Sequence, residues 1–126
     1  MTADDYRRIA LGLDGVIEAE HMGHPDFRVG GKIFATLQHG LRTGAVMLSP
    51  EDQARFVAEA PQVFSPETGA WGRAGSTRVQ LEPADEEIVG EALTVAWRRR
   101  IALSAEQKPR RAAPRRTGAR KAAKTR

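Results

Sequence analysis

The sequence predicts an α+β protein of two layers, in which three helices pack against an antiparallel sheet. The first observation is periodicity: segments with apolar residues at helical spacing alternate with strand-like segments, in the order helix, three or four strands, helix, one or two strands, helix. The second is that short connections join the first strands, which favours antiparallel hairpins. Helices packed on one face of such a sheet form a stable two-layer architecture.

The first predicted helix follows Thr2, a residue type that caps helices well, and ends at Asp14-Gly15. Its apolar face consists of Tyr6, Ile9, Ala10 and Leu13. Strands are expected over residues 16–20, 26–29, 32–37 and 45–48. The segment 21–25 is typical of a turn, and Gly30-Gly31 is a hairpin signal. In the third strand, Ile33, Ala35 and Leu37 should share one face.

The second helix is expected to start at Ser49-Pro50 and to end before Pro61, because serine is a good cap and proline fits the first helical position. Its inner face would be Phe56, Val57 and Ala60. A short strand at Val63-Phe64 and a loop over 65–76 follow. The strand Thr77–Leu81 alternates cleanly, with Val79 and Leu81 inward and Arg78 and Gln80 outward.

The last helix opens at Pro83–Glu87, and its apolar face is predicted to be Val89, Leu93, Ala96, Trp97 and Ile101. We place Arg98–Arg100 in its last turns, where cations complement the helix dipole. Trp97 and Phe34 are expected in the core. With about 100 residues, this body is long enough to bury a single core.

Charge divides the chain into two predicted regions, a globular domain over residues 1–103 and a tail over 104–126. The tail holds nine Lys or Arg and one Glu, whereas residues 1–97 hold eight basic and fifteen acidic residues, a net charge of −7. The tail has alanines as its only apolar side chains, so we expect it to be disordered alone, although Ala, Arg and Lys also favour helix when the charge is neutralised.

Composition excludes several classes of function. The absence of cysteine excludes disulfides, a thiolate nucleophile and a thiolate metal site. No apolar run approaches the length of a transmembrane helix, and the acidic N-terminus is unlike a signal peptide, so we expect a cytoplasmic protein without a membrane role. No histidine has a recognisable nucleophile or carboxylate partner in the sequence, so we expect no enzymatic activity and no cofactor.

An ordered set of short motifs resembles the MmcQ/YjbR family over roughly residues 3–103. The motifs are His24-Pro25-Asp26-Phe27-Arg28-Val29, Gly31-Lys32-Ile33-Phe34-Ala35-Thr36-Leu37, Trp71-Gly72 with Gly75 and Thr77, Val79-x-Leu81, and a closing Ala96-Trp97-Arg98. The resemblance implies a small bacterial cytoplasmic protein with a two-layer fold similar to secretion-chaperone and frataxin-like architectures. It also implies DNA binding, which the family label ties to a proposed double-wing motif.

Nucleic-acid binding requires clustered cations, because phosphate neutralisation supplies most of the affinity. In the acidic body, the candidate contacts are Arg28, Lys32, Arg73 and Arg78, which with Arg42 would form a positive patch if they share one sheet face. In the tail, the candidates are Arg110, Arg111, Arg115, Arg116, Arg120 and Lys121. The tail is otherwise a solubilising extension or a ligand for another acidic partner. A membrane surface fits less well, because the tail has no apolar face.

Three smaller features each have a structural and a functional interpretation. His21 and His24, with Asp26 or His39, have the residue types of a metal site but no fixed spacing, so we expect a polar turn and no metal. The segment 71–77 is rich in glycine and compatible with phosphate binding or stacking by Trp71, but a strand-entry loop with Trp71 packed on the sheet fits better. Lys32 is either a phosphate contact or a charge that protects a sheet edge.

Three functional hypotheses follow. The first is a protein that binds DNA or RNA non-specifically through phosphates, mainly by its tail. The second is a protein-interaction module whose acidic body binds a partner through an apolar patch. The third, more distant, is small-molecule binding or catalysis in a pocket near Trp71. We expect a monomer or a weak dimer.

Overall fold

A computed structural model describes residues 1–38 and 40–112, with side chains up to residue 105. Within these residues, four helices and a six-stranded antiparallel sheet confirm the α+β class. The elements are α1 (Ala3–Leu11), β1 (Ile17–His21), β2 (His24–Val29), β3 (Lys32–Gln38), β4 (Thr43–Met47), α2 (Pro50–Glu59), β5 (Phe64–Pro66), α3 (Gly69–Arg73), β6 (Ser76–Gln80) and α4 (Glu86–Ala112). The strand order is β1-β2-β3-β4-β6-β5.

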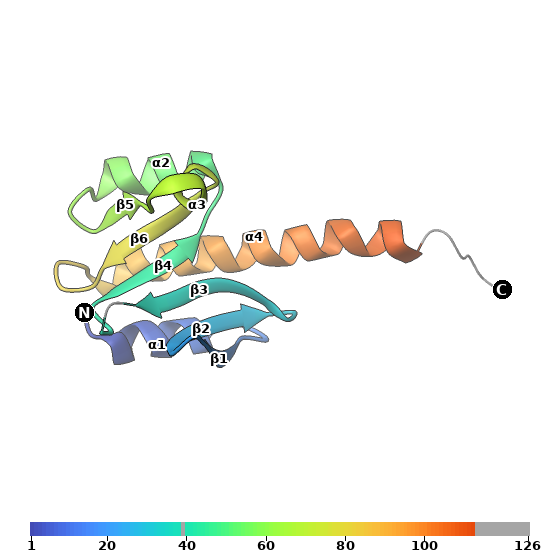
Figure 1. The fold of residues 1–126 in the computed structure, drawn as a ribbon, viewed down its shortest axis with the longest axis horizontal. Helices are drawn as coiled ribbons and strands as arrows, with labels where there is room; N and C mark the ends of the chain where they lie inside the picture. Colours follow the sequence, from blue (N-terminus) through green and yellow to red (C-terminus); the bar gives the residue numbers. More distant parts are fainter. Residues whose placement is uncertain (39, 113–126) are drawn as a thin grey trace.

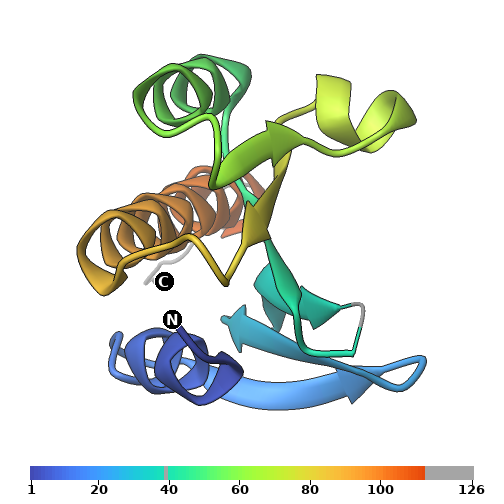
Figure 2. The ribbon, with the colours of Figure 1, turned by 90° about the vertical axis from the view of Figure 1, so that its left-hand side faces the viewer.

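The three longer helices lie on one side of the sheet, as predicted. Figure 2 shows α1, α2 and α4 on the left and the strands on the right. Helix α4 contacts β2, β3 and β4 and packs beside α1, whereas α2 contacts β5. The short helix α3 contacts β6 and lies at the margin of the opposite, open face. This arrangement leaves one face of the sheet without a covering helix.

The core lies between the sheet and the three longer helices. Its largest fully buried side chains include Tyr6, Phe27, Phe34, Phe56 and Phe64. The Tyr6 hydroxyl donates a hydrogen bond to the Ala45 carbonyl, 3.1 Å away, and burial raises the pKa of Tyr6. Phe34, which is fully buried, lies in the core as predicted. Trp97 is half-buried at the core's edge, where its Nε1 donates to the Asp14 carbonyl oxygen at 2.9 Å.

A bulge in β3 changes which side chains face the core. Asp26 and Phe27 pair with Thr36 and Ala35, but Arg28 pairs with Ile33, so Phe34 is the extra residue on β3. A bulge shifts the alternation of side chains by one residue. The prediction that Ile33 shares a face with Ala35 and Leu37 is therefore wrong, because Phe34 takes its place in the core and Ile33 lies on the open face.

Two predicted connections differ in the structure. The turn expected over 21–25 contains only Met22 and Gly23, and β2 already begins at His24. The loop expected over 65–76 contains α3, a helix of five residues that is too short to show a helical period. The Gly30-Gly31 hairpin is confirmed, since their φ angles of 62° and 79° are ones that glycine adopts without strain.

Helix α4 is longer than predicted. It continues to Ala112, so Arg98–Arg100 lie within it rather than in its last turns, and the backbone of residues 104–112, the first part of the predicted tail, is helical. The prolines at 109 and 114 favoured an earlier end in the sequence. Ile101, expected on the apolar face, is 40% exposed because the helix has passed the sheet there. Residues 113–126 lie outside the described residues. No helix in the described part of the chain is long and apolar enough to span a bilayer.

Candidate functional site

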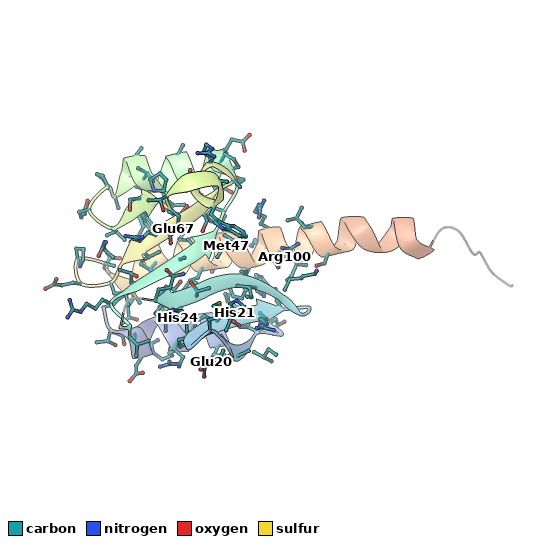
Figure 3. The ribbon with its side chains drawn as sticks, viewed as in Figure 1. Glu20, His21, His24, Met47, Glu67 and Arg100 are labelled. Atoms are coloured by element: carbon teal, nitrogen blue, oxygen red, sulfur yellow. The ribbon has the colours of Figure 1, made fainter. Side chains whose placement is uncertain are left out.

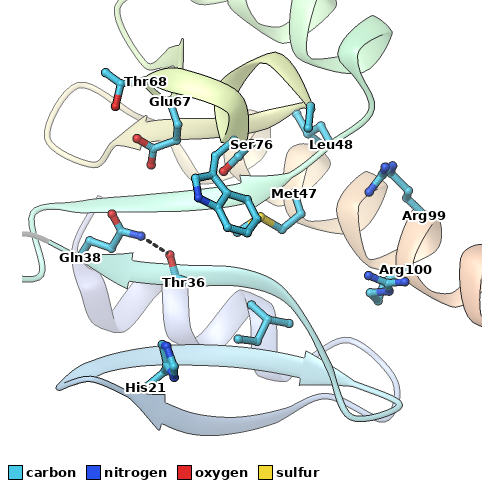
Figure 4. A pocket seen from close by; sticks show the side chains of 13 residues that line it. His21, Thr36, Gln38, Met47, Leu48, Glu67, Thr68, Ser76, Arg99 and Arg100 are labelled. Carbon is cyan, nitrogen blue, oxygen red and sulfur yellow. Dashed lines mark hydrogen bonds between the residues drawn. The ribbon is translucent and has the colours of Figure 1, made fainter.

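The open face of the sheet carries a cavity of about 680 Å³. Its floor comes from the central strands: Ile33, Thr36 and Gln38 of β3, Met47 of β4 and Ser76 of β6. One wall is formed by Glu67, Thr68, Trp71 of α3 and Ala74 just after it, and Arg99 and Arg100 of α4 contribute from another element (Figure 4). The cavity therefore joins a sheet face, a short helix and a long helix that are distant in sequence.

Close packing fixes the position of α3. A Cβ atom on Gly72 would lie 1.6 Å from the Glu67 carbonyl oxygen, and one on Gly75 would lie 1.9 Å from the Leu48 carbonyl oxygen. Gln53, buried on α2, donates from Nε2 to the carbonyl oxygens of Gly72 at 2.9 Å and Ser76 at 3.0 Å. The glycines of segment 71–77 thus serve close backbone packing, and they hold Trp71 in place.

Trp71 is 76% exposed, although its neighbour Gly72 is buried. The expectation that Trp71 packs on the sheet is therefore wrong. The reason is α3, a helical turn that the sequence did not predict. In this turn Gly72 packs closely against the Glu67 backbone, and the indole of Trp71 lines the cavity. An exposed indole beside a cavity presents a planar surface suited to stacking.

The charges around the cavity are unevenly distributed. Glu67 is the one acidic residue among the described lining residues, and its Oε1 accepts a hydrogen bond from Arg78 Nη2 at 3.1 Å. Arg99 and Arg100 form no ion pair with the side chains that the structure describes. The Nε of Arg100 is buried and has no hydrogen-bond partner among them. The α4 side of the cavity is therefore cationic, and its guanidinium groups have N–H donors without an acceptor among the described side chains.

The predicted cations of the body do not converge into one patch. Arg28 is held by Asp26, with Nε 2.7 Å from Oδ1 and Nη2 3.1 Å from Oδ2, and these bonds raise the pKa of Arg28. Arg78 is held by Glu67. Two strands separate β2 from β6, which places these arginines about 14 Å apart across the sheet. Lys32 lies at the β2–β3 turn and Arg73 on α3, and both are exposed.

The histidine pair lies on one hairpin. His21 at the end of β1 and His24 at the start of β2 are register partners, and Figure 3 shows them side by side. Asp26 is 1% exposed, and both of its carboxylate oxygens accept hydrogen bonds from Arg28. The described residues contain no group of three His, Asp or Glu placed to hold a metal ion, and His39 lies outside them.

The tail candidates are only partly described. Arg110 and Arg111 lie in α4 by their backbone, and their side chains are beyond the described ones. Arg115, Arg116, Arg120 and Lys121 lie outside the described residues. The sequence analysis missed Arg99 and Arg100 as cavity residues because it assigned them to a helix end. The signal that was available is the continuation of good helix formers past Ile101.

In a comparison with protein families, the YjbR family model matches residues 11–99. The chain belongs to the YjbR family. Among solved structures, a crystal structure of the Deinococcus radiodurans protein DR2400, described as carrying the DUF419 domain, is similar with a TM-score of 0.65. It is 20% identical, over 76% of this chain and 75% of that one, and it supports the fold alone. No curated protein matches the chain.

The YjbR match ends within α4 and covers nearly the whole cavity. All lining residues except Arg100 fall inside residues 11–99. The cations that follow Arg99 fall outside it. Arg100 therefore belongs both to the cavity lining and to the cations beyond the match.

Proposed function

We propose that this YjbR protein binds nucleic acid through a basic arm, which we define as residues 98–126, and that it does so without catalysing a reaction. The arm carries twelve Lys or Arg and one Glu, a net charge of +11. The observation that supports this most directly is that α4 runs past the end of the sheet to Ala112 and carries Arg110 and Arg111 in its last turn (Figure 1). A chain of cations neutralises phosphates without reading the sequence.

The helical part of the arm has dimensions that suit a duplex. Residues 98–112 form fifteen residues of helix, a rod of about 22 Å at 1.5 Å per residue. A helix of this width fits the major groove, where its cations reach the phosphates on either side. DNA and RNA both supply such phosphates, so the proposal covers non-specific binding to either.

The charges of residues 1–97 support the assignment of phosphate binding to the arm, because most basic residues of this body form ion pairs with acidic side chains. Of the eight before residue 98, five form ion pairs: Arg7, Arg8, Arg28, Arg55 and Arg78. Lys32 and Arg73 remain as additional phosphate contacts in our proposal. The acidic body, at −7, repels phosphates elsewhere and directs the duplex to the arm.

The partner-binding alternative is not favoured by any one observation. A protein docking surface needs a contiguous apolar patch. No observation joins the large exposed apolar side chains of the described chain into one surface: Leu11, Ile17, Met22, Leu41, Trp71 and Ile101. Nucleic-acid binding therefore remains our proposal. We expect the protein to act as a monomer or a weak dimer.

The proposal is tested by a salt titration of duplex-DNA binding, read by fluorescence anisotropy. With about eight phosphate contacts, the full chain should show a slope of log K against log salt of about −7. A full-length variant with glutamine at the nine Lys and Arg positions of 104–126 should lose most of this slope. The matched control is Lys32→Gln with Arg73→Gln, which should lower the slope by no more than about 2.

Two outcomes would overturn the proposal. One is the absence of duplex binding by the full chain at low salt. The other is a glutamine variant that binds as tightly as the full chain, since the affinity would then reside outside residues 104–126, which hold nine of the arm's twelve cations.

A further inference from the structure

We propose that the cavity on the open face binds a nucleotide, with its base stacked on Trp71 and its phosphate held by Arg99 and Arg100. Arg99 and Arg100 fall within the basic arm as defined above, but here they act in the cavity, so the site stands whether or not the rest of the arm binds a duplex. Four features of the cavity support it: an exposed stacking surface, cations with no ion pair among the described side chains, acceptors away from the cations, and a suitable volume.

The stacking surface is held in place by the packing of the backbone around Trp71. Trp71 is 76% exposed, and it lies on a short helix that Gly72 and Gln53 hold close to the body. Because the backbone beside it is fixed, the indole is displayed at the cavity without the loss of loop freedom that ordering on binding would cost. Every nucleobase has a planar face that stacks on such a ring.

The cations are available to an anionic ligand. Arg99 and Arg100 both line the cavity, and neither is paired with a carboxylate among the side chains described. The buried Nε of Arg100 has no partner there either. A buried donor without an acceptor is uncommon, and phosphate oxygens are strong acceptors for guanidinium groups. The two arginines thus form the phosphate end of the proposed site.

The other end of the cavity offers acceptors. Figure 4 shows Gln38, Glu67 and Thr68 on one side of the cavity and Arg99 and Arg100 on the other. Gln38 donates from Nε2 to Thr36 Oγ1 at 3.0 Å, which leaves its amide oxygen as an acceptor. Glu67 bonds Arg78 through Oε1, which leaves Oε2. Such acceptors favour a base with an exocyclic amino group, such as adenine.

The volume fits this class of ligand. Small-molecule sites typically occupy about 300–1,000 Å³, and this cavity measures about 680 Å³. The mixture of an aromatic ring, Met47 and a few polar groups at defined positions is also usual for such sites. Two sources of the same chemistry are a free nucleotide and an unpaired nucleotide in a single strand.

The test is calorimetric titration of the full chain with adenosine 5′-monophosphate at low salt. We expect saturable binding at one site. Trp71→Ala should weaken it by about tenfold or more, and Trp71→Phe should retain most of it, because a phenyl ring still stacks. Arg99→Ala with Arg100→Ala should weaken it by at least about tenfold, since two charge-assisted contacts are lost. Trp71 is exposed, so its substitution leaves the core unchanged.

The matched control for the arginine pair is Arg98→Ala. Arg98 is the adjacent residue, carries the same charge, is exposed, and does not line the cavity. It should bind adenosine 5′-monophosphate like the full chain. Adenosine without phosphate should bind more weakly than the monophosphate, and inosine 5′-monophosphate, which has no exocyclic amino group, should bind more weakly too.

The proposal is overturned if adenosine 5′-monophosphate does not bind at millimolar concentration, or if the Trp71→Ala and Arg99→Ala/Arg100→Ala variants bind it like the full chain. Equal affinity for the inosine nucleotide would overturn the role given to Gln38 and Glu67. The glutamine variant of residues 104–126 separates the two proposals, because it should lose duplex binding and keep the nucleotide. A single-stranded oligoadenylate added to that variant identifies the source: binding weakened by Trp71→Ala indicates an unpaired nucleotide of a strand.

Discussion

Thr2 and Asp5 form a reciprocal cap at the start of α1. Asp5 N donates to Thr2 Oγ1 at 3.1 Å, and Thr2 N donates to Asp5 Oδ2 at 2.9 Å. The hydrogen bond from the Thr2 backbone is the main reason that the pKa of Asp5 is lowered from 3.8. The sequence predicted Thr2 as the cap, and the structure confirms it.

Asp5→Asn tests this cap through its pH dependence. A lowered pKa in the folded state means that the ionised carboxylate stabilises the protein above the unfolded value of 3.8 and that this contribution is lost as the pH falls through the folded pKa. The variant should therefore be less stable than the native chain at neutral pH, and the difference should disappear in acid. Urea denaturation across the pH range measures it.

The matched control is Asp4→Asn, because Asp4 is the adjacent acid and does not cap the helix. It forms an exposed ion pair with Arg7, so its loss should matter less. A stability difference for Asp5→Asn that stays constant from neutral pH into acid would contradict the assigned role of the carboxylate.

At the scale of elements, Gln53 links three of them. It lies on α2, and its Nε2 donates to the carbonyl oxygens of Gly72 on α3 and Ser76 on β6, with a third contact to Thr77 Oγ1 at 3.3 Å. The sequence analysis named the apolar inner face of α2 and missed this polar residue. A buried glutamine has no periodic signature, because its partners come from segments distant in sequence.

Gln53→Leu should destabilise the protein by about 1–3 kcal/mol, since the volume is kept while buried hydrogen bonds are lost. Chemical denaturation measures the change in the free energy of unfolding. The control is Gln62→Leu, an exposed glutamine just after α2, which should stay within about 0.5 kcal/mol of the native chain. Equal effects of the two substitutions would show that the Gln53 contacts do not fix α3.

The same scale explains the errors in β3 and α4. Alternation of apolar and polar residues predicts which face of the sheet a side chain occupies only while every residue of the strand pairs with a neighbour. Phe34 has no partner on β2, so the alternation shifts by one residue within β3. In α4, the prolines and the charge of 104–126 indicated an earlier end than the structure shows. The caps at Thr2 and Ser49 were predictable because their hydrogen bonds join residues three apart.

For the whole molecule, one cluster of buried side chains runs from Tyr6 in α1 to Ala96 in α4. Since α1, α2, α4 and every strand except β1 contribute to this cluster, we expect residues 1–97 to unfold in a single transition. In the Trp71→Phe variant, the fluorescence of Trp97 reports on the α4 contact with Asp14, and circular dichroism reports on the helices. The two denaturation curves should coincide. A separate early transition in either signal would contradict a single cooperative unit.

The charge asymmetry and most of the element order were determined by the sequence alone. Local signals suffice for these: residue counts establish the acidic body and the basic arm, and caps, glycine turns and periodicity act over a few residues. The family resemblance was also visible in the order of short motifs, and the YjbR match confirms it.

Only the tertiary structure decided the candidate site. Whether Arg28 and Arg78 were available for phosphate contacts depended on Asp26 and Glu67, whose carboxylates form ion pairs with them on the folded sheet. Whether Trp71 was buried depended on α3, whose position is set by contacts with Glu67 and Gln53. Arg99 and Arg100 reach the cavity only because α4 passes the ends of the strands. Each of these outcomes depends on pairs of residues far apart in sequence, and periodicity along the chain carries no information about such pairs.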